Sequence, residues 1–291
     1  YSLTRVALQV VSAIVIGIAF LRLSSSATDL QNKVFALFQT AIISILIINQ
    51  VQPAFLRQRL YYGREASSNQ YGWRAFSVAI IVTEWPFSVF ANTMYFVIMY
   101  WLVGLNSGSD RIGYFYIMYI VLGIFSITLG QAIASFSPND IIAAMLNPIF
   151  TSMVILFCGV TIPYPLMPKF WKFMYRLSPF TYFLEGTLTN DLHGAKVRCR
   201  NEELYVFQPP KGMSCSKYAD GFVQNYIGYL NNPNATSNCQ YCPYKVGDDY
   251  YSALSWNFDH RWRNFGLLFA YLAFNIAFTT FMIKIYKVNK R

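Results

Sequence analysis

Six long apolar stretches run through this chain, and their length restricts it to one main class of fold. A helix needs about 20 apolar residues to cross a bilayer core about 30 Å thick, and each stretch meets that length. Apolar and polar residues do not alternate along them, so helices rather than barrel strands are predicted. The sequence therefore predicts an all-α integral membrane protein with six transmembrane helices. These cover residues 3–21, 34–55, 75–105, 112–136, 141–162 and 265–285.

The composition agrees with a membrane location. Hydrophobic residues make up 55% of the chain and charged residues only 12%, whereas a soluble domain carries about 25% charged residues. The net charge of +10 would suit a nucleic-acid partner, but the basic residues gather at the membrane edges, where the positive-inside rule puts them. We therefore expect contact with membrane lipid and no nucleic-acid binding.

The distribution of basic residues predicts that both termini are cytosolic. Eight basic residues lie in the loop after the second stretch and in the tail after the sixth, against three in the short loops of the other side. The eight are Arg57, Arg59, Arg64, Arg74, Lys284, Lys287, Lys290 and Arg291, and the three are Arg22, Lys33 and Arg111. The long region 163–263 then lies outside.

The outer region carries four of the five cysteines, which are Cys199, Cys215, Cys239 and Cys242. An even number of cysteines in an oxidising compartment predicts two disulfides. Zinc binding is the weaker alternative, because Cys239 and Cys242 have no second C-x-x-C pair, and no metal site is expected. Asn234-Ala235-Thr236 is a sequon in the same region, so Asn234 is a candidate glycosylation site.

Three polar features interrupt the apolar pattern. Glu84 is the only acidic residue well inside an apolar stretch, so it should pair with a basic group, Arg64 or Arg5 first. Pro86 should kink the same helix. Asn147-Pro148 in the fifth stretch either lines a cavity or forms an inter-helix hydrogen bond.

The loops carry further signals. The basic, aromatic segment 55–73 is either a short helix on the cytosolic membrane surface or a plain positive-inside anchor. Segments 170–177 and 180–186 predict short interfacial or re-entrant helices, because charges interrupt them too often for a seventh span. The two histidines, His193 and His260, have no catalytic neighbours in the sequence, so we expect solvated loop residues and no catalytic site.

The start of the chain and one missing motif complete this description. The chain begins at Tyr1 without a basic n-region, so no cleavable signal peptide is expected and the chain is expected to be a piece of a longer protein. It contains no G-x-x-x-x-G-K-[ST] phosphate loop. This piece is therefore not expected to bind or hydrolyse ATP itself.

Short motifs in nearly every loop resemble the membrane half of G-type ABC transporters, and in detail the fungal pleiotropic drug resistance group. The motifs that carry the resemblance are Gln31-Asn32, Arg57-Gln58-Arg59, Tyr62-Gly63-Arg64-Glu65, Glu84-Trp85-Pro86, Leu177-Ser178-Pro179-Phe180-Thr181-Tyr182, Glu185-Gly186, the run 228–242 with its last two cysteines, and Arg261-Trp262-Arg263-Asn264-Phe265-Gly266.

The resemblance implies the second six-helix membrane half of an ATP-hydrolysing plasma-membrane exporter of amphipathic drugs. ATP and Mg would then bind to nucleotide-binding domains elsewhere in the same polypeptide, which also holds a first membrane half. The resemblance also divides the chain into three parts. Residues 1–162 hold helices one to five, with a coupling loop at about 55–73. Residues 163–263 form an outer region, and residues 264–291 hold the sixth helix and a cytosolic tail. A lipid or sterol translocator of the same family, or a channel or receptor-like membrane protein without ATP-hydrolysing domains, remain as alternatives.

The resemblance also assigns roles to single residues. It places the cavity walls on the second and fifth helices, an apolar constriction above them, and the coupling to the nucleotide-binding domains in the first cytosolic loop. Candidate cavity residues are Gln39, Ile43, Leu46 and Gln50, which share one helix face, with Thr151, Ser152, Ile155 and Gly159; constriction residues are Val160 and Thr161; coupling residues are Arg57, Arg59, Arg64, Glu65 and Glu84. For each cavity position, plain helix–helix packing is the alternative.

The disulfide pairing has two alternatives from the residues alone. A Cys239–Cys242 bond closes too short a loop, while nested and crossed pairings close loops of similar length, so chain entropy does not choose between them. We expect the nested pairing, Cys199–Cys242 with Cys215–Cys239. It fits the family resemblance, and it lets 212–216 form one arm of a hairpin-like cap that faces 238–243.

Overall fold

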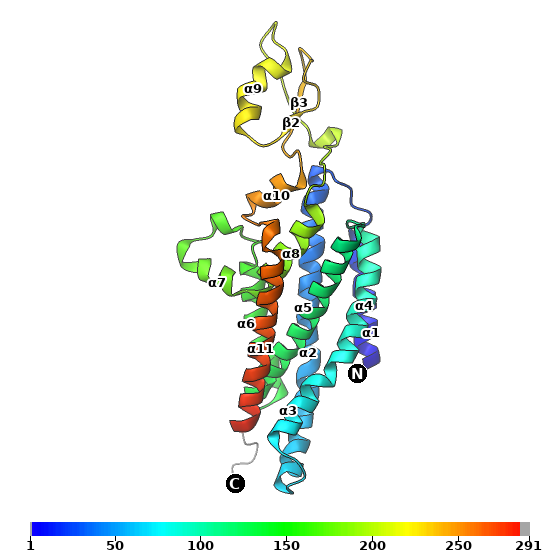
Figure 1. The fold of residues 1–291 in the computed structure, drawn as a ribbon, viewed down its shortest axis with the longest axis vertical. Coiled ribbons are helices and arrows are strands. Elements are labelled where there is room, and N and C mark those ends of the chain that lie inside the picture. Colours follow the sequence, from blue (N-terminus) through cyan, green and yellow to red (C-terminus); the bar gives the residue numbers. More distant parts are fainter. Residues whose placement is uncertain (1, 286–291) are drawn as a thin grey trace.

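The structure is a computed structural model that describes residues 2–285, and it consists of a long helical bundle with a small outer subdomain at one end (Figure 1). We call the opposite end of the bundle the inner end. α1 begins and α11 finishes on the side away from the outer subdomain. Lys287, Lys290 and Arg291, which contribute to the predicted charge asymmetry, lie outside the described residues.

Each of the six predicted apolar stretches is helical. Within residues 2–285, five helical segments are long and apolar enough to cross a membrane, and the segment Leu3–Ala19 is shorter. The chain is therefore an all-α integral membrane domain. The helices of the bundle are α1 (Ser2–Ala19), α2 (Ala27–Ser67), α3 (Trp73–Val82), α4 (Glu84–Val103), α5 (Ser109–Phe136), α6 (Asp140–Phe157) and α11 (Arg261–Ile285).

Two helices depart from the predicted bounds on the inner side. α2 is 41 residues long and does not end at Pro53. Its last turns therefore occupy the place of the separate surface helix that was considered for 55–73. Buried Phe55 and Leu56 keep these turns packed on the bundle. The third stretch is interrupted locally at Thr83, whose backbone angles stay helical. This is the distortion expected from Pro86, which has no N–H to donate to the carbonyl four residues earlier.

α6 is also shorter than predicted. It ends at Phe157, so residues 158–162 form a bend rather than a further turn of helix. Gly159 has a φ of +91°, a backbone conformation that a side chain would strain, and Pro163 follows. The predicted span 141–162 therefore extends too far at its end.

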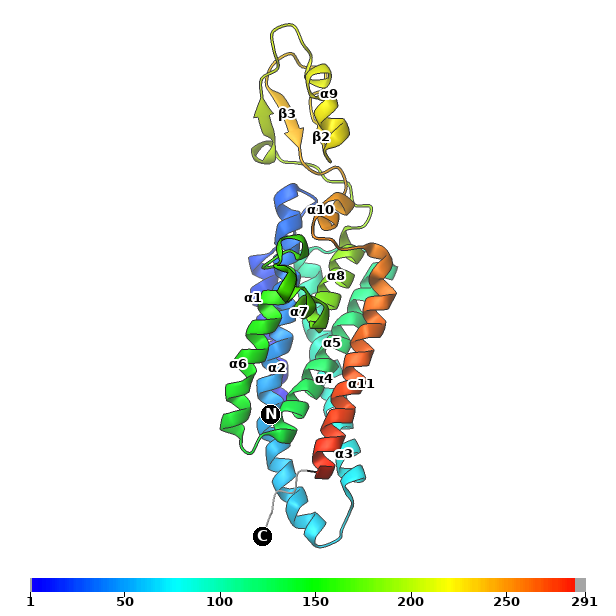
Figure 2. The ribbon, with the colours of Figure 1, turned by 90° about the vertical axis from the view of Figure 1, so that its left-hand side faces the viewer.

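α2 and α5 form the centre of the bundle, and the other long helices pack around them (Figure 2). The apolar core between these helices is rich in aromatic side chains. The fully buried rings include Tyr95, Tyr119, Phe115, Phe180 and Phe183. The last two come from α8, which enters the bundle from the outer side.

The region after α6 begins with four short helical segments, where two were predicted, at 170–177 and 180–186. They are the 3-10 turns η1 (Tyr164–Leu166) and η2 (Lys169–Trp171), then α7 (Lys172–Leu177) and α8 (Pro179–Leu192). α8 is buried along nearly its whole length against α2, α5 and α11. At its outer end Asp191 accepts a hydrogen bond from Lys33 Nζ at 2.9 Å, a buried ion pair between α8 and α2.

The outer subdomain, residues 199–242, holds a small antiparallel sheet in the order β1-β3-β2. Both disulfides have the expected nested pairing, Cys199–Cys242 and Cys215–Cys239. The expected hairpin arm is wrong, however: β3 pairs with β1 and β2, while Cys215 begins a helix and its N–H bonds to Ala235. The elements of this subdomain are η3 (Asn201–Glu203), β1 (Tyr205–Phe207), α9 (Cys215–Asn225), β2 (Tyr229–Leu230) and β3 (Cys239–Cys242). Between it and α11 lie α10 (Gly247–Ala253) and η4 (Phe258–His260).

Candidate functional site

The predicted cavity residues of α2 lie on its less buried face. Leu46 is 52% exposed and Gln39 is exposed, while Ile43 and Gln50 are half-buried. The opposite face is closed: Leu37, for example, has no exposed surface. An apolar strip with two amides is therefore left uncovered on a helix that is otherwise packed inside the bundle.

α6 lies beside this strip, but its predicted cavity residues do not all share one environment. Ser152 is exposed and Thr151 is half-buried. Ile155 instead lines a narrow apolar crevice that Phe38 and Ile42 of α2 complete. Gly159 is buried beyond the end of α6, where an added Cβ would come within 2.7 Å of the Tyr175 ring.

The two predicted constriction residues lie in the turn after α6. Val160 is half-buried and packs against the main apolar core. Thr161 is exposed, and its hydroxyl donates to the carbonyl of Ile155 at 3.0 Å. The hydroxyl group of Thr161 thus has a hydrogen-bond partner on the neighbouring end of α6.

A reciprocal amide pair joins α2 to α6. Gln52 Nε2 donates to Asn147 Oδ1 at 2.8 Å, and Asn147 Nδ2 donates to Gln52 Oε1 at 2.7 Å. Asn147 Nδ2 also lies 2.6 Å from Asn49 Oδ1. Of the two alternatives for Asn147, the structure shows the inter-helix hydrogen bond, and this pair fixes the inner halves of both wall helices together.

The residues predicted for coupling fall into separate groups. Arg57 and Arg64 are exposed near the inner end of α2. Glu65 accepts a hydrogen bond from the Tyr71 hydroxyl, which raises the pKa of Tyr71 to about 12. Arg59 is different, because it is buried and points into the bundle.

Arg59 binds the end of α5. Its guanidinium donates to the carbonyls of Ala134 at 3.1 Å, Ser135 at 2.9 Å and Ser137 at 2.7 Å. The last carbonyls of a helix have no intrahelical donor and carry partial negative charge. Arg59 therefore caps α5, a role that a basic residue in a basic loop does not reveal in sequence.

Glu84 has the predicted partner. Arg5 Nη1 lies 2.9 Å from Glu84 Oε2, and the two side chains are 2% and 13% exposed. Of the two candidates, Arg5 is thus confirmed as a partner of Glu84. This ion pair connects α1 to the start of α4.

A second cluster, which the sequence did not single out, surrounds Glu185 on α8. Its carboxylate accepts from the Asn257 backbone N–H at 3.2 Å and from Asn264 Nδ2 at 2.9 Å. His260 Nδ1 lies 2.9 Å and Arg263 Nη2 lies 3.5 Å from the same carboxylate. Glu185 thereby connects the re-entrant helix to the start of α11.

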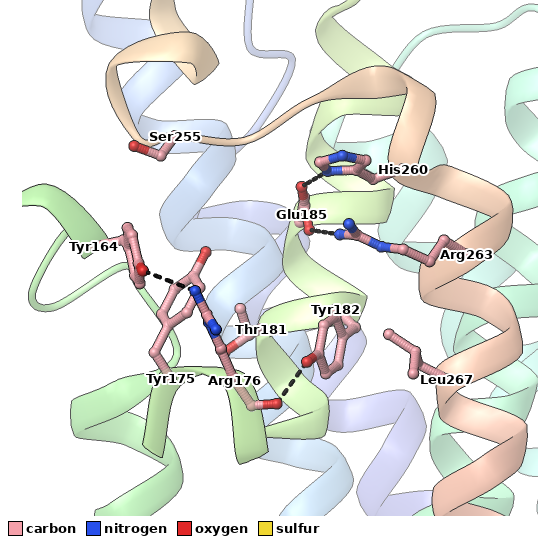
Figure 3. Close-up of a pocket in the computed structure, with 10 residues that line it drawn as sticks. All are labelled: Tyr164, Tyr175, Arg176, Thr181, Tyr182, Glu185, Ser255, His260, Arg263 and Leu267. Carbon is pink, nitrogen blue, oxygen red and sulfur yellow. Dashed lines mark hydrogen bonds and ion pairs between the residues drawn. The ribbon is translucent and has the colours of Figure 1, made fainter. Parts of the chain in front are cut away.

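A pocket of about 410 Å³ opens next to this cluster (Figure 3). Glu185, His260 and Arg263 form its polar wall, while Tyr164, Tyr182 and Leu267 are among the groups on its other sides. Both histidines keep about 40% of their side chain exposed, as expected for solvated loop residues, but each also contacts a carboxylate. His193 Nδ1 lies 2.6 Å from that of Asp248.

The outer subdomain is attached directly to the start of α2. Glu203 accepts hydrogen bonds from the N–H groups of Ala27 at 3.2 Å and Thr28 at 3.1 Å. A carboxylate at a helix N-terminus is favoured by unpaired N–H groups and by the helix dipole. Arg200 pairs with Asp29 at the same end. Nothing in the sequence spacing indicates this contact.

Comparison with known proteins gives matches along the whole chain. The profile of the family described as ABC-2 type transporter matches residues 1–192, and that described as CDR ABC transporter matches 243–291. "ABC multidrug transporter I" of Aspergillus fumigatus is 38% identical to this chain over 95% of its residues. "Brefeldin A resistance protein" of Schizosaccharomyces pombe is 34% identical over 99% of them. Each match covers 19% of the relative's own length. "ATP-dependent permease AUS1" of Saccharomyces cerevisiae is 35% identical over 94% of this chain and 20% of its own length. The chain thus spans about a fifth of these relatives.

Proposed function

The chain belongs to the ABC-2 type transporter family, and we propose that it forms the second membrane-spanning half of an ATP-driven exporter of amphipathic compounds. Two of the relatives named above carry drug-resistance names, and each is about five times as long as this chain. ATP and Mg would act on nucleotide-binding domains elsewhere in the same polypeptide, which would also provide a first membrane half.

The observation that carries this proposal is the uncovered strip of α2. Leu46 and Gln39 are exposed on the central helix of the bundle, and Ser152 is exposed on the helix beside it. A facing membrane half would close this strip into a cavity with apolar walls and a few amide and hydroxyl groups. Such walls bind varied apolar ligands, because they demand no fixed polar pattern.

Transport requires that this cavity opens alternately to the two sides. A ligand shifts such an equilibrium only by its differential affinity for the two forms, so ATP must favour one of them through the inner end of the chain. Arg57 and Arg64 are exposed there, and we assign them to contact with a nucleotide-binding domain. The same proposal places both termini in the cytosol, residues 163–263 outside, and the protein in the plasma membrane.

Substitution of Leu46 in the full-length transporter tests the proposal. Leu46→Ala and Leu46→Trp should each change the relative resistance of cells to a panel of apolar compounds while the amount of protein at the membrane stays the same. Phe274→Ala on α11 is the matched control, since this side chain is 66% exposed but lies away from α2. A variant unable to hydrolyse ATP gives the baseline.

The outcomes separate cavity lining from packing. A changed ranking of compounds for both Leu46 variants, with no change for Phe274→Ala, supports the assignment. An equal loss of resistance to every compound indicates that Leu46 acts in packing or coupling. Resistance that persists without ATP hydrolysis excludes an ATP-driven exporter.

A further inference from the structure

A groove between α3 and α11 lies at the inner end of the bundle, on a part of the surface that the proposed transport path does not use. It encloses about 440 Å³. Figures 1 and 2 both place the two helices side by side at that end. Its walls are mostly apolar, with Val78, Ile81, Val82, Trp85 and Ile276, and they also include the hydroxyl residues Ser77 and Thr280. An apolar groove in a membrane protein is a site for the apolar part of a lipid.

The inner mouth of the groove carries two cations. The guanidinium carbon of Arg74 lies 5.2 Å, and Lys284 Nζ lies 5.6 Å, from the ring centroid of Trp73. Both side chains are exposed. Among the described residues neither has a carboxylate within ion-pair distance. Two positive charges therefore lie near one indole ring, and within residues 2–285 no carboxylate forms an ion pair with either of them.

The length of the groove fits one leaflet. Trp73 and Trp85 mark its two ends on α3 and the start of α4. At about 1.5 Å per helical residue they are separated by roughly 18 Å along the axis, and half of a bilayer core is about 15 Å thick. Trp73 then lies at the depth of the headgroups, where indole rings and basic side chains concentrate.

We propose that this groove binds an anionic glycerophospholipid of the cytosolic leaflet. Arg74 and Lys284 would hold the phosphate and the anionic headgroup, and one acyl chain would follow Val78 and Val82 towards Trp85. Basic pockets between transmembrane helices on the cytosolic side favour anionic headgroups. A zwitterionic headgroup gains less, because its own cation is repelled by the same two residues. The assignment to the cytosolic leaflet rests on the proposed topology.

Spin-labelled lipids test this in nanodiscs that contain the full-length transporter. The fraction of immobilised phosphatidylserine is compared with that of phosphatidylcholine bearing the same label. In Arg74→Ala/Lys284→Ala the relative affinity for phosphatidylserine should fall about 25-fold, the product of about fivefold for each charge. Arg57→Ala/Arg64→Ala is the matched control, because it removes the same charge from the same end outside the groove.

A second variant tests the apolar wall without a change of charge. Val78→Trp should fill the groove and release the immobilised lipid, and Val78 is 63% exposed, so the fold tolerates the larger ring. Equal loss in the Arg57/Arg64 control would reduce the effect to general surface charge and overturn the site. Unchanged selectivity in Arg74→Ala/Lys284→Ala, or retained lipid in Val78→Trp, would also overturn it. None of these readouts depends on transport, so the proposed function is tested separately.

Discussion

The ion pair between Arg5 and Glu84 gives a quantitative test of how this membrane domain is held together. The two charged atoms are 2.9 Å apart, and both side chains are nearly removed from solvent. With an effective dielectric constant of about 20, two unit charges at that distance attract by roughly 6 kcal/mol. The cost of desolvating both groups offsets most of this attraction.

The net change in stability therefore depends on whether one charge of the pair is removed or both. Glu84→Ala leaves the Arg5 charge buried against apolar groups, which costs about 3–5 kcal/mol. Glu84→Gln retains an oxygen acceptor, and a neutral hydrogen bond is roughly half as strong as a charge-assisted one, so about half of that loss is expected. Arg5→Met/Glu84→Met removes both charges and should lie close to the wild type.

The thermal stability of the full-length protein is measured for each variant to test these expected losses. Samples are heated, and the remaining monodisperse protein is quantified by fluorescence-detected size-exclusion chromatography. At about 2 °C for each kcal/mol in a domain of this size, Glu84→Ala should lower the midpoint by roughly 6–10 °C and Glu84→Gln by about half as much. Arg5→Met and Glu84→Met are also measured alone. If Arg5→Met/Glu84→Met loses the sum of those two single losses, the residues are not coupled and the reasoning fails.

Other contacts give shorter tests. Asn147→Leu should lower the stability by about 1–2 kcal/mol, because each inter-helix hydrogen bond in a membrane contributes roughly 0.6 kcal/mol. Gln52→Leu in the same protein should cause no further loss, because it removes the same hydrogen bonds. Thermal midpoints of the single and double variants measure both effects. Burial would raise the pKa of Glu203, but backbone hydrogen bonds from its neighbours outweigh burial and hold the pKa below 4.5. Its contribution to stability is thus complete above about pH 4.5 and is lost as the pH falls through the lower folded pKa. Limited proteolysis of the outer subdomain should therefore accelerate only below pH 4.5 in the wild type, but already at neutral pH in Glu203→Gln. If Asn234, which is exposed, carries a glycan, Asn234→Gln should increase the electrophoretic mobility of the full-length protein.

The features that the sequence predicts correctly are those with a local or compulsory physical cause. Bilayer thickness sets the length of the apolar stretches, so five of the six helical segments qualify as spans by length. A carboxylate inside an apolar stretch must have a partner, and only a few basic residues are near enough to provide it. The partner of Glu84 was therefore predictable, and Arg5 was one of two candidates.

The features that were missed depend on contacts between distant parts of the chain. Glu185 binds groups 72 to 79 residues later in the sequence, and no spacing rule connects them. Arg59 belongs to a loop whose other arginines are exposed, so composition indicated a surface charge although the side chain is buried. The end of α6 was predicted too late, because apolar residues continue past Phe157 while the backbone turns at Gly159.

These long-range contacts also limit how the proposed cavity can open. α2 is continuous for 41 residues, roughly 60 Å, and Arg59 attaches its inner end to the end of α5. The Gln52–Asn147 pair attaches it to α6 as well. Displacement of the inner end should therefore move the α2 and α6 walls together. The cavity would then open between this chain and the facing membrane half.

A Gln52→Cys/Asn147→Cys disulfide should leave ATP-driven transport intact, whereas a disulfide from Leu46→Cys to the facing half should abolish it. If the Gln52–Asn147 crosslink alone stops transport, and reduction restores it, the two helices must separate during the cycle and the rigid-wall argument is wrong.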